Sequence, residues 1–535
     1  MEMASAAKPK TGRPAAWWTG VSPWLSAVGS AGFLTLAFPP FGFWPLAFVA
    51  LALLLWAVTS AERLVTAGLL GWLFGALFYY GSSWWATHSL IVYGGMSTPV
   101  AYVLIGVAAV LVAIPTALFA LGVHLTTLRE PSPGWWCIPA WWCVCEWLRG
   151  EVLAFGWNPL ANAVALEPWL ARAARLGGHY LVGAMVTAFA AGVVYALRQW
   201  PHRPVRALRG LAAGTLALLL PSLAALTGAL RPPEDVSDRE AAVAVIAVQP
   251  CAPMLTKVMS AYEQAEARQM QLALEGLRAA SDSARRMVIF PESQIALDAD
   301  RPGAEQSLRP LLAQGAWVLT NATRRVGDGF ANTALLYAPD GSTAEYQKVH
   351  LMPFGEYVPL GRYLPVELPT LAVEARPGKR IVTLPVTDDL RLGVGICFES
   401  AFPSLHRAFR QQGATVLVNL ANDGWFGRTP GSEQHLRHLV YRAIETGCPV
   451  VRVTNDGISA LIDAGGQVRD VVPQGQPDVR VWPVFPAASG MTPYVVVGDL
   501  FAWSCLAAVV GRLLWRLWTR IRFYTEAITD LVAGE

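Results

Sequence analysis

The sequence predicts a membrane-embedded bundle of about eight helices joined to an α/β domain outside the membrane. Hydrophobic residues make up 54% of the 535-residue chain and charged residues only 15%, with a mean hydropathy of +0.39. An ordinary soluble domain has roughly 25% charged residues, so part of this chain belongs in lipid. Residues 14–61 and 64–128 contain no Asp, Glu, Lys or Arg, whereas residues 231–486 have the composition of a globular domain.

The charge-free runs locate the transmembrane helices. Crossing a bilayer takes about 20 apolar residues, so each run is long enough for two helices and a turn. Pro39 and Pro40 separate the first pair, because proline cannot continue a helical hydrogen-bond ladder. We expect helices at residues 21–38, 42–59, 64–86, 99–126, 134–149, 178–197, 209–229 and 494–516.

The basic residues predict the orientation of the bundle. With the N-terminus in the cytoplasm, the short outer loops hold only Arg149, Arg172 and Arg175. This is the positive-inside pattern, and it places the segment between the seventh and eighth helices outside the cytoplasm. The apolar stretch after residues 8–13 is too long for a signal peptide, so we expect a retained anchor. The inner loops and tails hold Lys8, Lys10, Arg13, Arg63, Arg129, Arg198, Arg203, Arg206, Arg209, Arg516, Arg520 and Arg522.

The globular segment shows alternating strands and helices. Its apolar, β-branched runs predict strands at residues 241–249, 287–290, 317–323, 330–338, 391–397, 414–423 and 449–457. Helices are predicted at residues 254–280, from residue 402, and at residues 432–446. Near-continuous apolar strands that alternate with helices are typical of a sheet covered by helices.

Three ionisable residues stand at strand ends or just beyond them: Glu292, Lys348 and Cys397. The functional crevice of such a sheet lies outside the carboxyl ends of its strands, so the three side chains are expected to converge there. A free thiol needs a neighbouring base or cation to become a good nucleophile. Glu292 can accept the thiol proton, and Lys348 can stabilise a thiolate and the oxyanion on an attacked carbonyl. The set predicts nucleophilic acyl transfer.

Each of these residues also has a simpler interpretation. A cysteine at a strand end is most often a small buried hydrophobic residue. Glu292 follows a proline and fits a solvated turn, and Lys348 fits a surface position. The order and context of the three residues favour the catalytic interpretation.

Other site classes are not supported by the sequence. A net charge of +3 without a basic stripe argues against nucleic-acid binding. The seven irregularly spaced cysteines give no disulfide or zinc framework. We therefore expect no metal and no cofactor. Two groups of residues resemble metal ligands in type and spacing. Cys137, Cys143 and Cys145 are interpreted as membrane-packing residues, and His435 and His438 as residues of a packed or surface helix.

Two further cysteines lie in the globular segment. Cys251 ends the first predicted strand and is expected near the site. A bridge between Cys251 and Cys397 is conceivable in an oxidising compartment, but a bridged nucleophile is inactive, so we expect Cys397 to be free. Cys448 is expected in the core.

Four motifs resemble the nitrilase, or carbon–nitrogen hydrolase, superfamily: FPES, YQKVHLMPFGEYVPL, GVGICFES and NLANDGWFG. With the surrounding helices, residues 20–520 resemble the membrane-bound apolipoprotein N-acyltransferase family. The resemblance implies an αββα sandwich with Glu292 as general base, Lys348 as electrostatic stabiliser and Cys397 as nucleophile. It implies domains at residues 1–230 (helices one to seven), 231–490 (catalytic) and 491–535 (last helix and tail).

The resemblance also implies supporting residues. Glu356 and Glu399 match carboxylates that support the site, and Trp425 matches an aromatic residue near the acyl pocket. Phe398 stands where some members of the family have tyrosine, so a hydrogen bond from that hydroxyl is missing here.

The implied reaction moves an acyl chain from a phospholipid, commonly phosphatidylethanolamine, to Cys397 as a thioester. The α-amino group of the S-diacylglyceryl-cysteine of an apolipoprotein then takes the acyl chain, at the periplasmic side of the bacterial inner membrane. The alternative is a membrane-tethered amidohydrolase with water as acceptor. A transporter or scaffold is a third class, but it would be expected to lack part of the triad.

Two hypotheses concern contacts with lipid. Phe354 and Tyr357, together with the segment 424–427, are expected to flank a lipid entrance. Charges within or beside a membrane need a role, so Arg149 is expected either to meet a phospholipid headgroup or to pair with Glu146 or Glu151.

Overall fold

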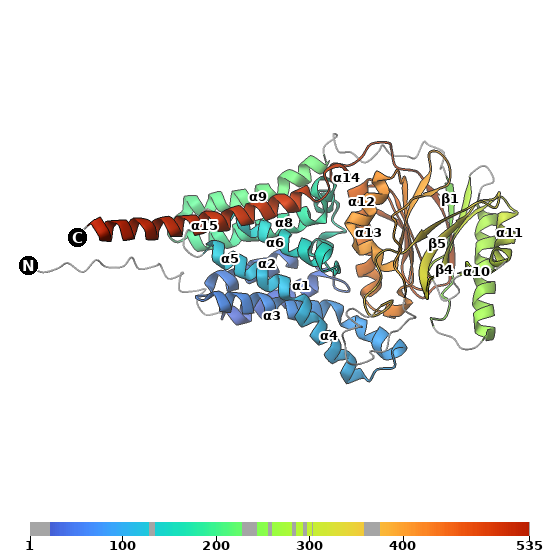
Figure 1. The fold of residues 1–535 in the computed structure, drawn as a ribbon, viewed down its shortest axis with the longest axis horizontal. Coiled ribbons are helices and arrows are strands. Elements are labelled where there is room, and N and C mark those ends of the chain that lie inside the picture. The colour runs from blue at the N-terminus through green and yellow to red at the C-terminus, as the bar shows by residue number, and fades with distance from the viewer. Residues whose placement is uncertain are drawn as a thin grey trace, which may run out of the picture.

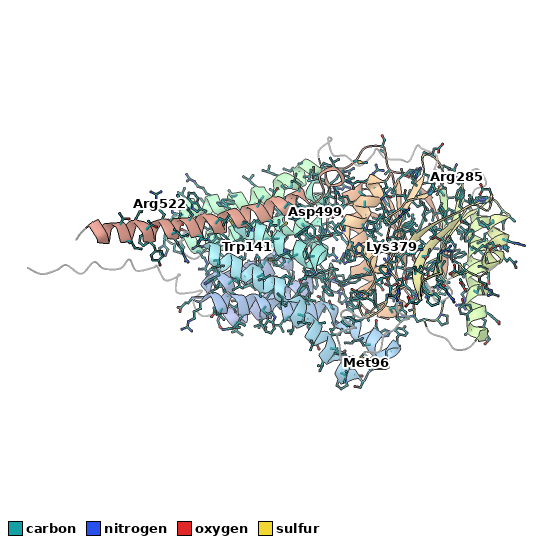
Figure 2. The ribbon with its side chains drawn as sticks, in the orientation of Figure 1. Met96, Trp141, Arg285, Lys379, Asp499 and Arg522 are labelled. Atoms are coloured by element: carbon teal, nitrogen blue, oxygen red, sulfur yellow. The ribbon has the colours of Figure 1, made fainter. Side chains whose placement is uncertain are left out.

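The structure, a computed structural model, describes residues 22–127, 134–226, 243–254, 259–280, 285–292, 297–301, 303–357 and 375–533. Figure 1 shows an elongated molecule in which a bundle of helices ends against a sandwich of two sheets. The last helix, α15, runs back along the bundle to its far end. Trp141 lies within the bundle, whereas the charged side chains of Arg285 and Lys379 lie on the sandwich (Figure 2).

Every predicted membrane segment contains helix, but the predicted number of eight spanning helices is not confirmed. Among the residues that the structure describes, five stretches are long and apolar enough to cross a membrane: Leu64–Ala86, Thr98–Thr127, Ala174–Gln199, Pro204–Leu226 and Leu500–Glu526. Helices α1 and α2 have 15 residues each and α6 has 11, which is short of the length that a bilayer requires. The bundle consists of α1 (Pro23–Ala37), α2 (Leu46–Ser60), α3 (Leu64–Ser83), α4 (Thr98–Val112), α5 (Ile114–Thr127), α6 (Cys137–Trp147), α8 (Ala174–Gln199), α9 (Pro204–Leu226) and α15 (Leu500–Ala533).

Helix α8 is interrupted near its start, close to the predicted first residue at 178. Gly177 and Gly178 have non-helical backbone, and Gly178 has a φ of +73°. A Cβ atom on Gly178 would lie 2.8 Å from the ring of Tyr494 in α14 (Pro493–Val497). Glycine is needed here both for the backbone conformation and for this close approach between the bundle and the segment that follows the sandwich.

The α/β part is a sandwich of two sheets with helices on both outer faces, which confirms the predicted αββα fold. The first sheet has the order β13-β1-β2-β4-β5-β6, with β3 beside β4, and the second has the order β12-β11-β10-β9-β8-β7. The strands are β1 (Val243–Gln249), β2 (Arg286–Ile289), β3 (Leu297–Asp298), β4 (Trp317–Val326), β5 (Gly329–Tyr337), β6 (Thr343–Gln347), β7 (Leu384–Pro385), β8 (Arg391–Ile396), β9 (Val416–Ala421), β10 (Val450–Thr454), β11 (Ser459–Ile462), β12 (Val468–Val472) and β13 (Asp478–Val484).

Strand β1 shows how the sandwich is filled. Successive side chains of a strand point to opposite faces. Val243, Val245 and Ala247 pack in the core between the two sheets. Ile246 and Val248 pack in a second core on the other face, with residues of α10 (Met259–Ala279). Because both faces are covered, the strand is apolar from Val243 to Val248, without alternating polar residues.

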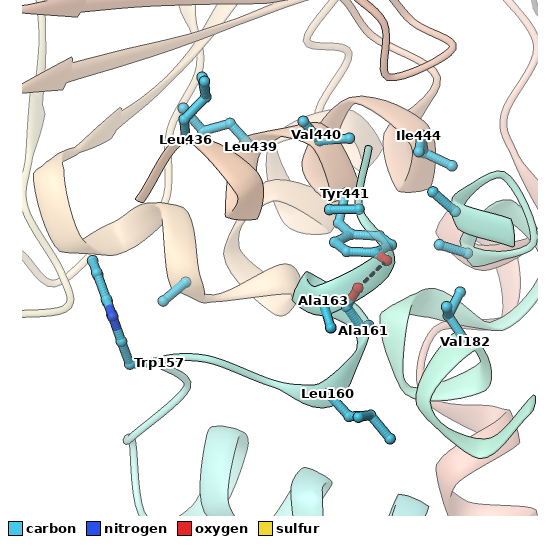
Figure 3. Packing of buried hydrophobic residues seen from close by; sticks show 14 of the residues in the cluster. Trp157, Leu160, Ala161, Ala163, Val182, Leu436, Leu439, Val440, Tyr441 and Ile444 are labelled. Carbon is cyan, nitrogen blue, oxygen red and sulfur yellow. Dashed lines mark hydrogen bonds between the residues drawn. The ribbon is translucent and has the colours of Figure 1, made fainter. Parts of the chain in front are cut away.

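The other outer layer, formed by α12 (Pro403–Gln411) and α13 (Gly431–Thr446), lies between the second sheet and the bundle (Figure 1). Every residue of α13 except Glu433 is buried. The hydroxyl of Tyr441 donates a 2.6 Å hydrogen bond to the carbonyl of Ala161, in a loop of the bundle (Figure 3). The helix therefore packs against the sandwich on one side and the bundle on the other.

The side-chain amide of Gln434, at the start of α13, also joins the two parts. The side-chain oxygen of Gln434 accepts hydrogen bonds from the indoles of Trp85 and Trp157, both at 3.0 Å, and from the amide of Asn158 at 3.1 Å. Its nitrogen donates to the carbonyl of Ser82 at 2.9 Å. Gln434 is 1% exposed, so these four bonds satisfy a fully buried group.

The predicted domain limits at residues 230 and 490 stay predictions. Helix α9 ends at Leu226 and β1 begins at Val243, and the limit at residue 230 lies outside the described residues. The limit at residue 490 falls between the end of β13 and the start of α14. Strands β3, β6, β7, β11, β12 and β13 were not predicted from the sequence; β3 pairs with β4, and the others extend the two sheets at their edges.

Candidate active site

The candidate nucleophile stands at the end of a buried strand. Cys397 directly follows β8 and begins the short 3-10 helix η9 (Cys397–Ala401). Its φ is +51°, a conformation that costs a residue with a side chain about 1–2 kcal/mol. Strained backbone of this kind clusters at functional sites, where the surrounding structure has to hold it.

Glu292 reaches the same edge from the other sheet. It follows β2 and forms an isolated parallel bridge with Thr454 at the end of β10, so the carboxyl ends of strands from both sheets meet here. Its Oε1 accepts a 2.7 Å hydrogen bond from Asn332. Its Oε2 is buried and has no hydrogen-bond partner among the described residues. The Cys397 thiol is close enough to affect the pKa of the Glu292 carboxyl group. Because Oε2 has no other partner in the part of the chain that the structure describes, it is available to accept the thiol proton.

Lys348 lies between two carboxylates. It directly follows β6, is 1% exposed, and places its Nζ 2.9 Å from Glu356 and 3.7 Å from Glu292. The amide nitrogen of Asn332 donates to both carboxylates, at 2.7 Å to Glu292 and 3.2 Å to Glu356. The ammonium and this amide together fix both carboxylates around one position.

Burial and neighbouring charges determine the protonation states of Cys397, Lys348 and Glu292 before substrate binds. Burial, followed by the Glu292 carboxylate, raises the pKa of the Cys397 thiol well above its ordinary value, against the opposing effect of Lys348. Burial opposes a charge on Lys348, but Glu356 and Glu292 outweigh it and raise the pKa of the ammonium. Burial also raises the pKa of Glu292, an effect that Lys348 opposes. The site at rest therefore contains a neutral thiol that needs a base, a charged Lys348, and a carboxyl group tuned toward neutral pH.

Glu399 holds the segments of the nucleophile and the lysine together. This fully buried carboxylate accepts hydrogen bonds from the backbone of Val349 and His350, at 2.8 and 3.0 Å, and from the hydroxyl of Tyr346 at 2.7 Å. Its other oxygen accepts from the backbone of Ile396 at 2.8 Å. Its contacts thus lie beside Lys348 and beside Cys397, and they fix the spacing between the two.

Comparison with known proteins agrees with this architecture. The family model "Apolipoprotein N-acyltransferase N-terminal domain" matches residues 30–192, and the model "Carbon-nitrogen hydrolase" matches residues 242–482. The apolipoprotein N-acyltransferase of Geobacter metallireducens is 31% identical over 515 residues, which cover 92% of this chain and 95% of the relative. The chain belongs to the apolipoprotein N-acyltransferase family. Members from Rhizobium etli (30% identical, 83% of this chain, 86% of the relative) and Haemophilus influenzae (28%, 92% and 94%) are also similar.

Aromatic side chains lie around the segment after the nucleophile. Phe398 is buried and stacks on Trp157 of the bundle, with ring centroids 6.2 Å apart and an interplanar angle of 18°. Trp425 is half-buried and meets Tyr93 edge to face at 4.9 Å. Ser89 donates a hydrogen bond to the carbonyl of Trp425. The bundle thus contributes directly to the surroundings of the site.

The proposed lipid entrance is only partly described. Phe354 is 51% exposed and has a φ of +62°, and its backbone N–H bonds to the carbonyl of Tyr357 at 2.7 Å. Tyr357 is half-buried. The rest of this stretch, residues 358–374, lies outside the described residues. Phe354 has the exposed aromatic surface that the lipid hypothesis requires.

Arg149 does not occupy the position expected for a contact with a phospholipid headgroup. It is 2% exposed, and its guanidinium donates to the carbonyls of Phe155 and Trp157 at 2.7 and 2.6 Å. Glu146 lies 3.9 Å away. A guanidinium enclosed in this way does not face a headgroup, so the structure favours the alternative in which Arg149 pairs with Glu146 inside the protein.

The remaining cysteines and histidines occupy packed positions. All seven cysteines are free, so Cys397 is not bridged to Cys251, which lies at the end of β1 with its N–H bonded to the carbonyl of Asn455. Cys448 is fully buried in the core, as predicted. Both His435 and His438 are buried on α13. No group of three or more His, Cys, Asp or Glu side chains that could hold a metal is found among the residues that the structure describes.

Two features of the site were missed from the sequence. Asn332 bridges the two carboxylates, and its signal was a polar residue within the apolar run FANTALLYA. His435 was considered only as an apparent metal ligand and interpreted as a packed or surface residue, yet its Nε2 lies 3.0 Å from the carbonyl oxygen of Cys397. That contact spans 38 residues, and nothing in the local sequence indicates it.

Proposed function

We propose that this protein transfers an acyl chain from a membrane phospholipid to the α-amino group of the N-terminal S-diacylglyceryl-cysteine of apolipoproteins. The observation that carries the proposal is the convergence of Cys397, Glu292 and Lys348 at one edge of a sandwich that is built onto a membrane bundle. Membership of the acyltransferase family favours an amine acceptor over the alternative of an amidohydrolase that uses water.

The first half-reaction forms a thioester. Glu292 accepts the thiol proton, and the Cys397 sulfur attacks the ester carbonyl of the phospholipid. The oxyanion that develops is stabilised by the Lys348 ammonium, which Glu356 holds at 2.9 Å. The tetrahedral intermediate then expels the lysophospholipid alkoxide, which takes the proton from Glu292. The products are an acyl-enzyme and a lysophospholipid.

The second half-reaction transfers the acyl chain to the acceptor. The neutral α-amine attacks the thioester carbonyl, Glu292 removes a proton from the attacking nitrogen, and the sulfur leaves and is protonated again. The result is an amide and the resting thiol. The first product leaves before the acceptor amine attacks the thioester on Cys397, so we propose ping-pong kinetics.

The bundle explains why both substrates can be lipid-anchored. Moving an acyl chain into water costs about 0.8 kcal/mol per CH₂ group, and a site built onto the membrane avoids most of this cost. We propose phosphatidylethanolamine as the donor and the periplasmic side of the bacterial inner membrane as the location. Labelling of Ser342→Cys, in an exposed turn, by an impermeant maleimide in spheroplasts tests the orientation.

The acyl-enzyme is tested by intact-mass analysis after incubation with phosphatidylethanolamine vesicles. The wild type is expected to gain one acyl chain that hydroxylamine removes, and Cys397→Ala is expected to gain none. Adding a diacylglyceryl-cysteine peptide should discharge the enzyme to a triacylated peptide without free fatty acid. If the folded wild type with a free thiol gains no mass, acyl transfer is refuted. Release of free fatty acid with no acylated peptide would instead support the amidohydrolase alternative.

A further inference from the structure

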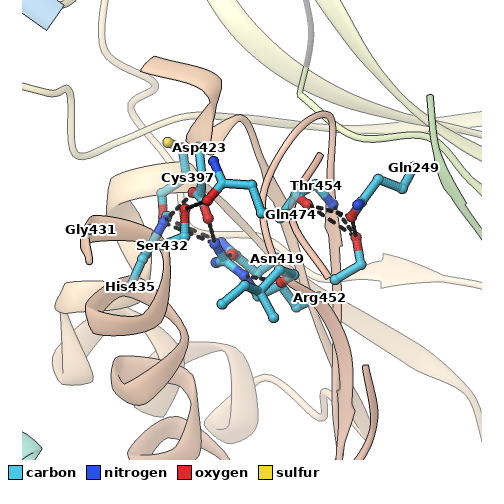
Figure 4. Close-up of polar contacts among 12 residues, drawn as sticks. Gln249, Cys397, Asn419, Asp423, Gly431, Ser432, His435, Arg452, Thr454 and Gln474 are labelled. Carbon is cyan, nitrogen blue, oxygen red and sulfur yellow. Dashed lines mark hydrogen bonds and ion pairs between the residues drawn. The ribbon is translucent and has the colours of Figure 1, made fainter. Parts of the chain in front are cut away.

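A buried polar network contacts the backbone of Cys397 and takes no part in the chemistry described above (Figure 4). It consists of Asn419 in β9, Asp423 in the short helix η10 (Asp423–Phe426), His435 in α13 and Arg452 in β10. All four side chains are fully buried. Burying two charged residues and an imidazole is costly unless each polar atom has a partner, so the network needs a reason.

Two side chains of the network meet the carbonyl oxygen of Cys397. The Nε2 of His435 lies 3.0 Å from it, and the Nδ2 of Asn419 lies 3.3 Å from it. A carbonyl oxygen can only accept hydrogen bonds. The Nε2 atom of His435 therefore carries a proton whether the imidazole is neutral or charged.

Arg452 holds both of these donors in place. One guanidinium nitrogen donates to the side-chain oxygen of Asn419 at 2.6 Å, and the other donates to Asp423 at 2.5 Å. The second oxygen of Asp423 lies 2.8 Å from Nδ1 of His435. Although burial opposes it, Arg452 and His435 lower the pKa of Asp423 and keep it a carboxylate. The charges of Asp423 and Arg452 offset each other, and both donors toward Cys397 are oriented by the same guanidinium.

The carbonyl that these donors meet belongs to the strained residue. Cys397 has a φ of +51°, and its peptide bond to Phe398 is planar, so fixing the carbonyl oxygen fixes the whole peptide plane. The direction of the Cys397 side chain depends on that plane. The thiol can be held toward Glu292 only while the peptide is held as well.

We propose that His435 is a positioning residue for the nucleophile: its Nε2–H, with Asn419, holds the Cys397 peptide in the orientation that acyl transfer requires. Asp423 and Arg452 hold His435 and Asn419 in turn. The inference rests on the proposed function of Cys397 as nucleophile, and it adds a residue that touches neither the substrate nor the sulfur. A misplacement of about 1 Å can cost about 100-fold in rate.

Two substitutions of His435 separate positioning from stability. In His435→Gln, the side-chain amide nitrogen can reach the place of Nε2 and keep the hydrogen bond to Cys397. In His435→Asn, the shorter amide can meet Asp423 in place of Nδ1 but does not reach the carbonyl. The control is His438→Asn, which makes the same change on the same helix at a residue that is 2% exposed and bonds to Asn162.

Two rates are measured on the full-length protein in detergent, together with its thermal midpoint. One is alkylation of Cys397 by iodoacetamide without lipid, and the other is single-turnover thioester formation with phosphatidylethanolamine. We expect His435→Asn to lose about 100-fold in both rates, and His435→Gln and His438→Asn to stay within about threefold of the wild type. If His435→Asn does not fold, His435→Phe replaces it as the ring without a donor.

Equal rates in His435→Asn and the wild type would overturn the proposal. So would a loss in His435→Gln as large as that in His435→Asn with both proteins folded, or losses that simply follow the thermal midpoints. The alkylation rate does not depend on the acyl donor. A wild type that is alkylated but never acylated would therefore refute the proposed function, while the comparison of variants would still decide the role of His435.

Discussion

Replacing Lys348 by methionine tests the central charge arrangement of the site. Methionine has a similar shape but no charge, so the substitution leaves Glu292 and Glu356 facing each other without the ammonium that lies 3.7 and 2.9 Å from them. Breaking a buried ion pair by removing one partner costs about 3–5 kcal/mol. For a domain of this size, each kcal/mol lowers the unfolding midpoint by about 2–4 °C. We therefore expect Lys348→Met to unfold about 6–20 °C below the wild type.

The loss is expected to depend on pH. Burial raises the pKa of the Glu292 carboxyl in the folded protein, and Lys348 opposes this rise, so without the ammonium this pKa lies further above its value in the unfolded chain. Groups with a raised folded pKa stabilise the protein at low pH, and this stability is lost as the pH rises. The midpoint of Lys348→Met should therefore lie further below that of the wild type at pH 8 than at pH 5.5. The added substitution Glu356→Gln should restore part of the midpoint at pH 8 but none of the acyl transfer.

The assay is thermal unfolding in one detergent, followed by tryptophan fluorescence. Lys379→Met is the matched control, because Lys379 is exposed on the sandwich, and it should change the midpoint by no more than about 1 °C. The reasoning is refuted if Lys348→Met and Lys379→Met unfold together. It is also refuted if the difference from the wild type is the same at both pH values.

Further substitutions test other parts of the molecule. Because burial raises the pKa of Glu292, the rate of thioester formation should fall with decreasing pH through a midpoint above the ordinary value of about 4.3. A midpoint at or below about 4.3 would contradict this role. Glu292→Gln should lower the rate about 100-fold or more at every pH. Gln434→Ala removes four buried hydrogen bonds between the two parts and should lower the unfolding midpoint by several degrees, whereas no change would show that the junction is held by packing alone. Serine at Phe354 and Tyr357 should slow turnover of vesicle lipid more than iodoacetamide alkylation of the thiol, and unchanged lipid kinetics would remove their proposed role at the entrance. Arg149→Ala should lower stability by about 3–5 kcal/mol without changing headgroup preference, and an altered preference in a stable variant would restore the headgroup role.

The sequence was sufficient for the parts of the fold that repeat a simple pattern. Strands β1, β8, β9 and β10 were predicted because their runs are mostly apolar, and they are buried on both faces; helix α13 was predicted because its length and composition are typical. The placement of Glu292 and Cys397 at strand ends followed from the same pattern, since the carboxyl ends of parallel strands lie at one edge of a sheet, whereas Lys348 follows β6, which was not predicted.

The remaining features depend on contacts that no local pattern encodes. The hydrogen bond between Trp85 and Gln434 joins residues 349 positions apart. The hydrophobic runs located the membrane helices, but α1, α2 and α6 are shorter than the runs that contain them. Pro39 and Pro40 follow the end of α1, Pro45 precedes the start of α2, and a π-helical turn follows α6. Arg149 stood at the end of a predicted helix, where a lipid-facing position was as reasonable as a buried one; only the loop that carries Trp157 decides between them.

The burial of α13 affects how this protein can be used outside a membrane. An outer helix of a sandwich usually leaves one face to water and carries polar residues there, but α13 leaves only Glu433 outside its two contacts. A catalytic domain excised at residues 243–484 would expose that face, including Gln434 and Tyr441, and would remove their hydrogen-bond partners in the bundle, Ser82 and Ala161. Engineering a soluble version would therefore mean redesigning α13 itself, whose opposite side holds the histidine beneath the nucleophile. Helix α13 packs against the membrane bundle on one side and carries His435 on the other, so neither side can be redesigned without affecting the other.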